Sequence, residues 1–350
     1  MRLGLQSVSL AVVTLLVLVS SSLPPAPFPL PPATVQTTQE RQAEVIRLND
    51  EGQQLANRGR NPEALEKYQQ ALTIARAIQD RQSEGTILNN IGAMHDNLGQ
   101  YPQALEFLQQ ALTISKELGD RAGESNTLNN IGEVHRSLDQ YPQTLEFYQQ
   151  ALAISKELGN RSGEGTRLNN IGEVHRSLDQ YPQALEFLQQ ALAISKELGN
   201  RSGEGTRLNN IGGVYANLEQ YPQALEFYQK ALAISKEVGN RLGEGTTLNN
   251  IGQVYDSLGQ YLQALEVYQQ ALAIRKEVGD RPGEGTTLNN IGLVYARLGQ
   301  NSRALEFLQQ ALVIRKAVGD RAGESRTLKN IEAVNRRLGR SSKALFFSRS

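Results

Sequence analysis

The stretch L-N-N-I-G at residues 88–92, followed by A-L-E-F-L-Q-Q-A-L at residues 104–112, decides the fold of this chain. Both phrases recur with a forty-residue period. The first begins at Leu88, Leu128, Leu168, Leu208, Leu248 and Leu288, and variants of the second begin at Ala104, Thr144, Ala184, Ala224, Ala264 and Ala304. A fixed period of this length indicates a stacked repeat array. Such arrays offer long surfaces rather than one reaction centre.

Each period is predicted to be a hairpin of two helices. In residues 120–139, Asp120 is placed to cap a helix, and apolar residues then recur at spacings of three and four. One unit earlier, Gly99 stands where that first helix should end, and Pro102 opens the second helix, where its missing N–H costs nothing. The buried stripe of the second helix is Ala104, Leu105, Leu108, Ala111, Leu112, Ser115 and Leu118.

Glycine recurs in the middle of each first helix, where it costs up to about 1 kcal/mol relative to alanine. The positions are Gly92, Gly132, Gly172, Gly212, Gly252 and Gly292. Their recurrence together with the small residues Ala104 and Ala111 predicts a close approach of the two helices, where a larger side chain would not fit.

The spacing L-x-x-I-G-x-x-Y, then G-x-Y-x-x-A-x-x-x-[LY]-x-x-A, resembles the tetratricopeptide repeat. The residues on its signature positions are Leu88, Ile91, Gly92, His95, Ala104, Leu108 and Ala111. The resemblance implies an all-α, right-handed solenoid of stacked antiparallel hairpins. The forty-residue unit is longer than the usual repeat of about thirty-four. It resembles the long-repeat subclass of Pins/LGN scaffolds and kinesin light chains, with a regularity typical of cyanobacterial-type arrays.

The array is predicted to cover residues 41–350. Seven full units begin at residues 41, 81, 121, 161, 201, 241 and 281, and a partial unit covers residues 321–350. The partial unit is expected to hold a first helix plus a stub of the second, reaching only Ala344-Leu345-Phe346-Phe347. It is either a cap or a truncated end.

Residues 1–22 have the layout of a secretory signal peptide, with a positive start, an apolar run and small residues. Residues 23–40 hold six of the twelve prolines and predict a semi-rigid linker. The chain is therefore expected to be exported to the periplasm or the extracellular space. The alternative is an uncleaved anchor in the cytoplasmic membrane, because the apolar stretch of about 17 residues reaches the lower limit for a span.

Composition disfavours several classes of function. The formal net charge is zero, which disfavours electrostatic binding to nucleic acid. The chain has no cysteine, and no phosphate loop, nucleophile elbow or metal motif occurs. The three histidines stand where later units have tyrosine, so we interpret them as packing residues: His95, His135 and His175. The sequence predicts a non-enzymatic protein without metal or cofactor.

Two adjacent asparagines recur in each first helix, although asparagine is a mediocre helix former. They are Asn89, Asn90, Asn129, Asn130, Asn169, Asn170, Asn209, Asn210, Asn249, Asn250, Asn289 and Asn290. Each amide offers two donors and an acceptor, so a row of them can hold the backbone of an extended peptide. The resemblance implies that both positions face an inner groove and that long-repeat arrays hold peptides by an asparagine ladder. The alternative is that one asparagine of each pair bonds a neighbouring unit's backbone; which row faces a ligand stays open.

Two positions per unit vary beside these rows, three and six residues beyond the second asparagine. The candidates there for partner choice are Glu133, Arg136, Glu173 and Arg176. The alternative is a local pair at i,i+3, such as Glu133 with Arg136, which stabilises a helix by a few tenths of a kcal/mol.

The last unit is basic, with eight Arg or Lys and two Glu in residues 321–350. Arg326, Lys329 and Asn330 resemble the positions that bind carboxylates in chaperone-binding members of the family. The resemblance implies docking of an acidic residue or a C-terminus through charge-assisted bonds. The alternative is a solubilising cap.

Together these patterns predict a scaffold or adaptor that binds a protein or an extended peptide in its concave groove. The alternative is a structural role, either as an envelope spacer or as a self-assembling array. The partner and the oligomeric state are left open by the sequence.

Overall fold

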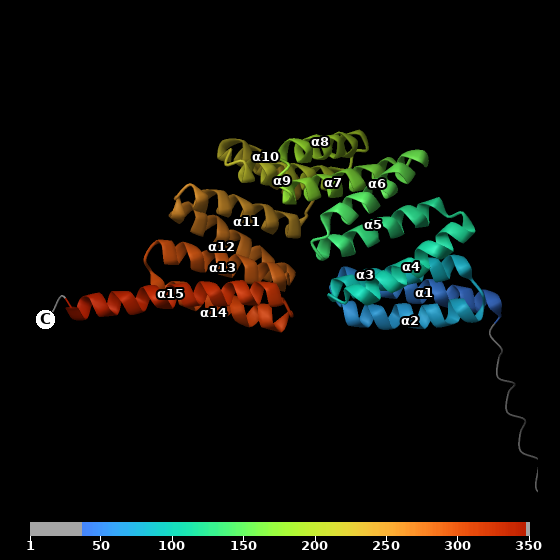
Figure 1. Ribbon diagram of the computed structural model, residues 1–350, viewed down its shortest axis with the longest axis horizontal. Helices are drawn as coiled ribbons and strands as arrows, with labels where there is room; N and C mark the ends of the chain where they lie inside the picture. Colours follow the sequence, from blue (N-terminus) through green and yellow to red (C-terminus); the bar gives the residue numbers. More distant parts are fainter. Residues whose placement is uncertain (1–36, 348–350) are drawn as a thin grey trace, which may run out of the picture.

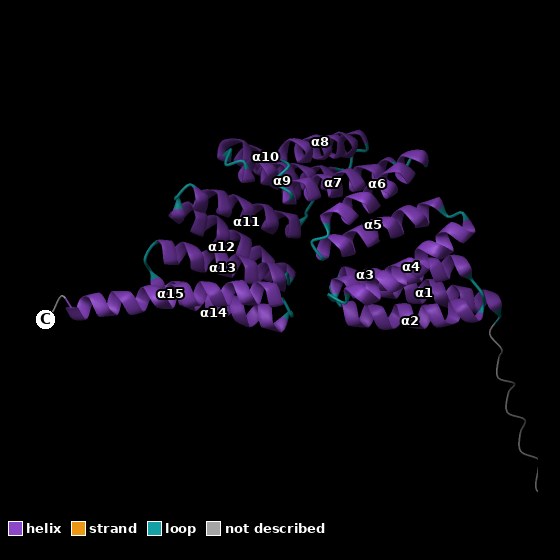
Figure 2. Cartoon of the chain, viewed as in Figure 1, coloured by secondary structure: helices purple, strands orange, loops and turns teal. Residues whose placement is uncertain are grey.

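The computed structural model describes residues 37–347, with the backbone alone for residues 340–347. All regular elements in this range are α-helices (Figure 2). They are α1 (Thr38–Asn57), α2 (Asn61–Ala77), α3 (Arg81–Asn97), α4 (Tyr101–Leu118), α5 (Arg121–Ser137), α6 (Tyr141–Glu157), α7 (Arg161–Ser177), α8 (Tyr181–Glu197), α9 (Arg201–Asn217), α10 (Tyr221–Glu237), α11 (Arg241–Ser257), α12 (Tyr261–Val278), α13 (Arg281–Arg297), α14 (Asn301–Ala317) and α15 (Arg321–Phe347). The predicted all-α array of hairpins is confirmed.

Local signals set the helix ends as predicted. The Asp120 carboxylate accepts a hydrogen bond from the Gly123 N–H at 2.9 Å and so caps α5. Gly99 adopts a left-handed conformation with a φ of 70°, which reverses the chain between α3 and α4. Pro102 lies in the first turn of α4. The left-handed residue recurs at the end of the first helix in all seven full units, but Asp139, Asp179 and Glu219 replace the glycine in three of them. Leu262 and Ser302 replace the proline in α12 and α14. The hairpins are therefore formed mainly by short-range chemistry.

The hairpins stack into an arch (Figure 1). Consecutive odd-numbered helices contact each other closely, with α5 and α7 as the loosest pair. Even-numbered helices of neighbouring units make no comparable contact in the described part of the chain. A stack bends toward the side on which its units approach, so the odd-numbered helices line the inner face and the even-numbered helices the outer face.

The core of each unit depends on the mid-helix glycine. Leu108 of α4 is fully buried against α3. A Cβ on Gly92 would lie 2.5 Å from Leu108 Cγ and 3.2 Å from the Ala104 carbonyl oxygen. Both distances are shorter than van der Waals contact, so the predicted close approach of the two helices is confirmed.

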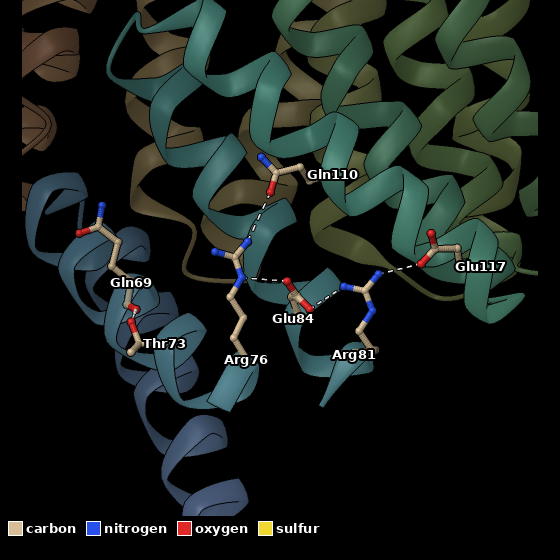
Figure 3. Close-up of polar contacts among 7 residues, drawn as sticks. All are labelled: Gln69, Thr73, Arg76, Arg81, Glu84, Gln110 and Glu117. Carbon is tan, nitrogen blue, oxygen red and sulfur yellow. Dashed lines mark hydrogen bonds and ion pairs between the residues drawn. The ribbon is translucent and has the colours of Figure 1, made fainter. Parts of the chain in front are cut away.

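An ion-pair cluster on the surface joins the first unit to the second (Figure 3). Arg81 of α3 bonds Glu84 one turn later and Glu117 of α4, both at 2.7 Å. Arg76 of α2 bonds the same Glu84 at 2.9 Å and reaches Gln110 at 3.4 Å. Glu84 therefore joins α2 to α3, and Arg81 extends the cluster to α4. The Arg–Glu–Glu arrangement of Arg81 recurs at Arg121, Arg161, Arg201 and Arg241.

Replacing Glu84 by glutamine is expected to lower the free energy of unfolding at neutral pH. It should also make that free energy less dependent on pH in the acidic range. Burial opposes ionisation of Glu84, but hydrogen bonds from Arg76 and Arg81 outweigh it and hold the pKa of this carboxyl below its ordinary 4.5. A lowered pKa contributes stability above the ordinary value, and this is lost as the pH falls through the folded-state pKa. Urea denaturation at neutral and acidic pH checks this. Glu117→Gln, at an exposed site, should change the free energy of unfolding at acidic pH much less.

The first boundary differs from the sequence prediction. Helix α1 begins at Thr38, so residues 38–40, predicted as linker, are helical. Thr37 and Glu40 form a capping box, in which each side chain bonds the other's backbone N–H. The predicted signal peptide and residues 23–36 of the linker lie outside the described residues. No helix in residues 37–347 is long and apolar enough to cross a membrane.

The predicted stub of a second helix after residue 339 is wrong. Helix α15 runs without a break from Arg321 to Phe347. Second helices elsewhere are pinned by an Ala-x-x-x-[LY]-x-x-Ala stripe, whereas here Ser348 stands at the place of the Leu or Tyr that follows Ala344. Without that packing, local helix propensity continues the first helix instead. Leu328, whose counterpart Leu88 is fully buried, is consequently 45% exposed.

Candidate functional site

The asparagines form one ladder along the inner face. Asn130 Nδ2 of α5 donates to Asn89 Oδ1 of α3 at 2.9 Å. The same bond, from the second asparagine of one unit to the first of the unit before, joins every neighbouring pair of odd-numbered helices. The other pairs are Asn90 to Asn49, Asn170 to Asn129, Asn210 to Asn169, Asn250 to Asn209, Asn290 to Asn249 and Asn330 to Asn289, at 3.0–3.2 Å.

This ladder differs from the alternative in which one asparagine of each pair bonds the backbone of a neighbouring unit. The neighbouring unit supplies a side-chain oxygen, not a backbone group, and both rows take part. Each first-row asparagine is the acceptor, and each second-row asparagine is the donor. The two rows therefore have different roles, which a single sequence does not distinguish.

The ends of the ladder carry charged residues. Asp50 stands at the donor position of α1, for which no earlier described helix provides an acceptor. Lys329 stands at the acceptor position of α15, where no later described helix provides a donor. The asparagine pair is complete only where both neighbours are present. Asp50 and Lys329 thus stand at the two positions of the described ladder that have no bonding partner.

The first-row asparagines are buried in the later units and more accessible in the earlier units. Asn249 is 3% exposed, and its Oδ1 accepts a second bond from Thr287 Oγ1 at 3.2 Å. Asn289 is similarly buried and bonded by Thr327. Asn89 and Asn129 are half-buried and accept from the ladder donor alone. Access to the first row is therefore greatest in the early units.

The charged candidates in the third and fourth units form local pairs. Arg136 Nη2 lies 2.7 Å from Glu133, and Arg176 Nη2 lies 2.7 Å from Glu173. Glu133 also accepts a bond from Asn170 Nδ2 at 3.0 Å, which ties it to the ladder. The i,i+3 pairing considered for the sequence is therefore present, and it places both pairs beside the asparagine rows.

Two further units hold an aspartate at the variable position that Arg136 and Arg176 occupy. Asp96 and Asp256 are partly buried, and burial raises the pKa of both carboxyl groups. Asp256 pairs with Arg297 of the next unit. A signal was present in the sequence: opposite charges forty-one residues apart, the same offset as the asparagine ladder. This offset could be interpreted only once it was known which residues of neighbouring units lie side by side.

The three candidate residues of the basic last unit, Arg326, Lys329 and Asn330, do not share one role in the structure. Asn330 donates to Asn289 and is the last donor of the ladder. Arg326 and Lys329 are exposed and make no hydrogen bond or ion pair within the described residues. Carboxylate binding at this end remains a prediction.

The histidines are packing residues, as predicted. His95 stacks on Phe107 with ring centroids 5.2 Å apart, and its Nδ1 lies 2.6 Å from Gln100 Oε1. His135 and His175 make the equivalent contacts. In residues 37–347 no cluster of His, Cys, Asp or Glu is arranged to hold a metal ion.

Small notches recur between neighbouring odd-numbered helices. One lies between α3 and α5 and is lined by Thr86, Asn89, Asn126 and Thr127, among others. Another lies between α9 and α11, with Thr206, Asn209, Thr246 and Thr247 at the same places in the repeat. First-row asparagines thus border a row of notches on the inner face.

Comparison with known proteins identifies the family to which this architecture belongs. A family model of the tetratricopeptide repeat matches residues 44–117, 123–197, 206–277 and 279–349. The chain belongs to the tetratricopeptide repeat family. No curated protein sequence matches it. The forty-residue units are therefore long members of a known repeat class.

Solved structures with the same tetratricopeptide fold are similar over most of the chain. The apo form of RapI has a TM-score of 0.62 at 18% identity, covering 79% of this chain and 99% of that one. The apo quorum sensor NprR from B. thuringiensis has a TM-score of 0.63 at 14% identity, covering 91% and 88%. A Rap protein complexed with competence and sporulation factor has a TM-score of 0.56 at 14% identity, covering 87% and 99%. These low identities show the fold alone.

Proposed function

We propose that this tetratricopeptide repeat protein is an interaction scaffold that binds an extended peptide segment along its inner face. One observation carries the proposal. The ladder uses the Oδ1 of each first-row asparagine as an acceptor, which fixes the direction of the amide. The Nδ2 of Asn49, Asn89 and Asn129 then makes no hydrogen bond within the described residues and is available to donate.

The spacing of these donors suits a peptide backbone. Packed helices lie about 8–10 Å apart. An extended chain advances about 3.3 Å per residue, so one repeat corresponds to about three peptide residues. Amide donors at that interval can bond backbone carbonyls without reading the side chains. Each bond stabilises the complex by about 0.5–1.5 kcal/mol, opposed by the cost of ordering the peptide.

The similar structures support a protein or peptide partner. One is a Rap protein complexed with competence and sporulation factor, and another is a quorum sensor. The fold of this chain is that of an interaction scaffold, and the proposal adds where and how it binds.

Replacing Asn49 and Asn89 by aspartate is expected to weaken peptide binding about tenfold while the fold is kept. Aspartate retains the oxygen that accepts from Asn90 or Asn130, but it removes the donor that we assign to the peptide. Peptides selected from a displayed random library against the unmodified protein provide the probe. Fluorescence anisotropy gives Kd, and circular dichroism gives the thermal midpoint.

A matched control makes the same chemical change on the outer face. Gln69 and Gln109 are exposed on α2 and α4 of the same two units, and Gln69→Glu with Gln109→Glu should leave Kd unchanged. Equal binding by the aspartate variant and the unmodified protein would show that the first row does not face the peptide.

A further inference from the structure

Two arginines occupy the notches of the middle units. Arg167 of α7 and Arg207 of α9 stand where Thr127 and Thr247 line open notches in other units. The guanidinium of Arg167 reaches α5, and that of Arg207 reaches α7. Both groups thus lie between odd-numbered helices of the inner face, next to the asparagine ladder.

The hydrogen bonds of these guanidinium groups are incomplete. Arg167 is 7% exposed; its Nη2 donates to Asn126 Oδ1 at 2.7 Å and to the Ser125 carbonyl at 3.4 Å. Arg207 is half-buried and makes only two long bonds to backbone carbonyls, at 3.4 and 3.5 Å. The Nε of each is buried without an acceptor.

Neither arginine has a carboxylate partner within the described residues. The acidic residues nearest in their own helices, Glu164 and Glu204, are bonded by Arg161 and Arg201. Burial alone lowers the pKa of Arg167 and Arg207, with no opposing charge. A buried charge is normally paired, because removing it from water is costly.

The other buried arginines of this chain do have such a partner. Arg275 and Arg315 are each 5% exposed, and each lies near an aspartate, Asp280 at 3.7 Å and Asp320 at 3.9 Å. Both are on even-numbered helices, at the repeat position that Ser115 and Ser235 hold at the notches. Burial without a counter-ion is therefore specific to the two arginines beside the ladder.

We propose that Arg167 and Arg207 receive two carboxylates of an acidic peptide that lies along the inner face. The inference rests on the proposed function and specifies the class of partner. Charge complementarity supports it, since two uncompensated cations lie in neighbouring units. The loose contact between α5 and α7, which Arg167 spans, supports it further.

The repeat geometry sets the spacing of the two acids. Units about 8–10 Å apart match three residues of a polyproline II chain, which advances about 3.1 Å per residue. In that conformation residues i and i+3 point the same way. The fitting ligand carries Glu or Asp at i and i+3.

Four capped, proline-rich peptides test this by isothermal titration at low salt. They carry Glu at i and i+3, Glu at i and i+1, Gln at i and i+3, or phosphoserine at i and i+3. The Glu peptide with i,i+3 spacing is expected to bind at least tenfold tighter than the Gln and i,i+1 peptides. Arg167→Gln and Arg207→Gln should each weaken it about tenfold or more, as expected for a lost charge-assisted bond.

Stability distinguishes this role from a structural one. Because Arg167→Gln removes an uncompensated buried charge, its thermal midpoint should be unchanged or higher. The control Arg275→Gln leaves Asp280 without its partner and should lower the midpoint without changing the affinity for the Glu peptide. A lower midpoint in Arg167→Gln with unchanged affinity would assign Arg167 to structure and overturn the inference.

The remaining outcomes are equally decisive. Equal affinity for the Glu and Gln peptides, no binding of the Glu peptide, or binding of the phosphoserine peptide alone would each overturn the inference. If library peptides still depend on Asn49 and Asn89 in that case, the proposed function stands without the acidic specificity. If no library peptide binds either, both proposals fail.

Discussion

Replacing Asn249 by alanine should lower the free energy of unfolding by about 2–3 kcal/mol. Asn249 is 3% exposed, and its Oδ1 accepts from Asn290 Nδ2 and Thr287 Oγ1, both at 3.2 Å. Thr287 is fully buried, so its hydroxyl would be left without an acceptor. A buried unsatisfied polar group costs about 1–3 kcal/mol, and the half-buried Asn290 adds a smaller loss. Urea denaturation followed by circular dichroism measures the change.

Two comparisons isolate the hydrogen bonds from other effects of the substitution. Asn89→Ala, at a half-buried position that accepts only from Asn130, should cost about 1 kcal/mol. Combining Asn249→Ala with Thr287→Val should cost less than the sum of the two single changes, because the unsatisfied hydroxyl is gone. Strict additivity, or equal losses at Asn89 and Asn249, would contradict a ladder that is sealed in its later units.

Replacing Gly212 by alanine should destabilise the array by about 1–2 kcal/mol, although alanine is the better helix former. A Cβ at this position would lie 2.8 Å from both Cδ1 and Cε1 of Tyr228. Tyr228 is 3% exposed and held by the core, so the ring has little room to move. Overpacking costs about 1–3 kcal/mol, of which helix propensity returns at most about 1.

The neighbouring glycine provides the control in the same helix. A Cβ on Gly213 would meet only Tyr228 Oη, at an ordinary 3.6 Å. Gly213→Ala should therefore stabilise α9 by up to about 1 kcal/mol. Denaturation midpoints of the two variants should move in opposite directions. A gain in stability for Gly212→Ala would show that the two helices are not in close contact there.

Much of the fold could be predicted because its causes are local. The caps at Asp120, the left-handed turn at Gly99 and the mid-helix glycines act over a few residues, and each leaves a mark in most units. The forty-residue period then multiplies each signal. The failure at α15 has the same explanation, because a turn predicted from local residues lacked the packing that stabilises it elsewhere.

The candidate site could be predicted only in part. The asparagine rows were evident as a costly choice in a helix, but their bonds join residues forty-one positions apart. The pairs of Glu133 with Arg136 and of Glu173 with Arg176 follow from helix spacing. Asp256 with Arg297, like the isolation of Arg167 and Arg207, depends on which units touch and how closely.

The sequence by itself determined that this chain is a stack of helical hairpins, because periodicity, caps and glycines act within a unit of forty residues. Only the tertiary structure decided which amide of each asparagine pair is the acceptor, where the ladder is sealed, and which buried arginines lack a counter-ion. These properties arise between units. Hydrogen bonds and burial there depend on the distance between neighbouring helices, which no single unit specifies.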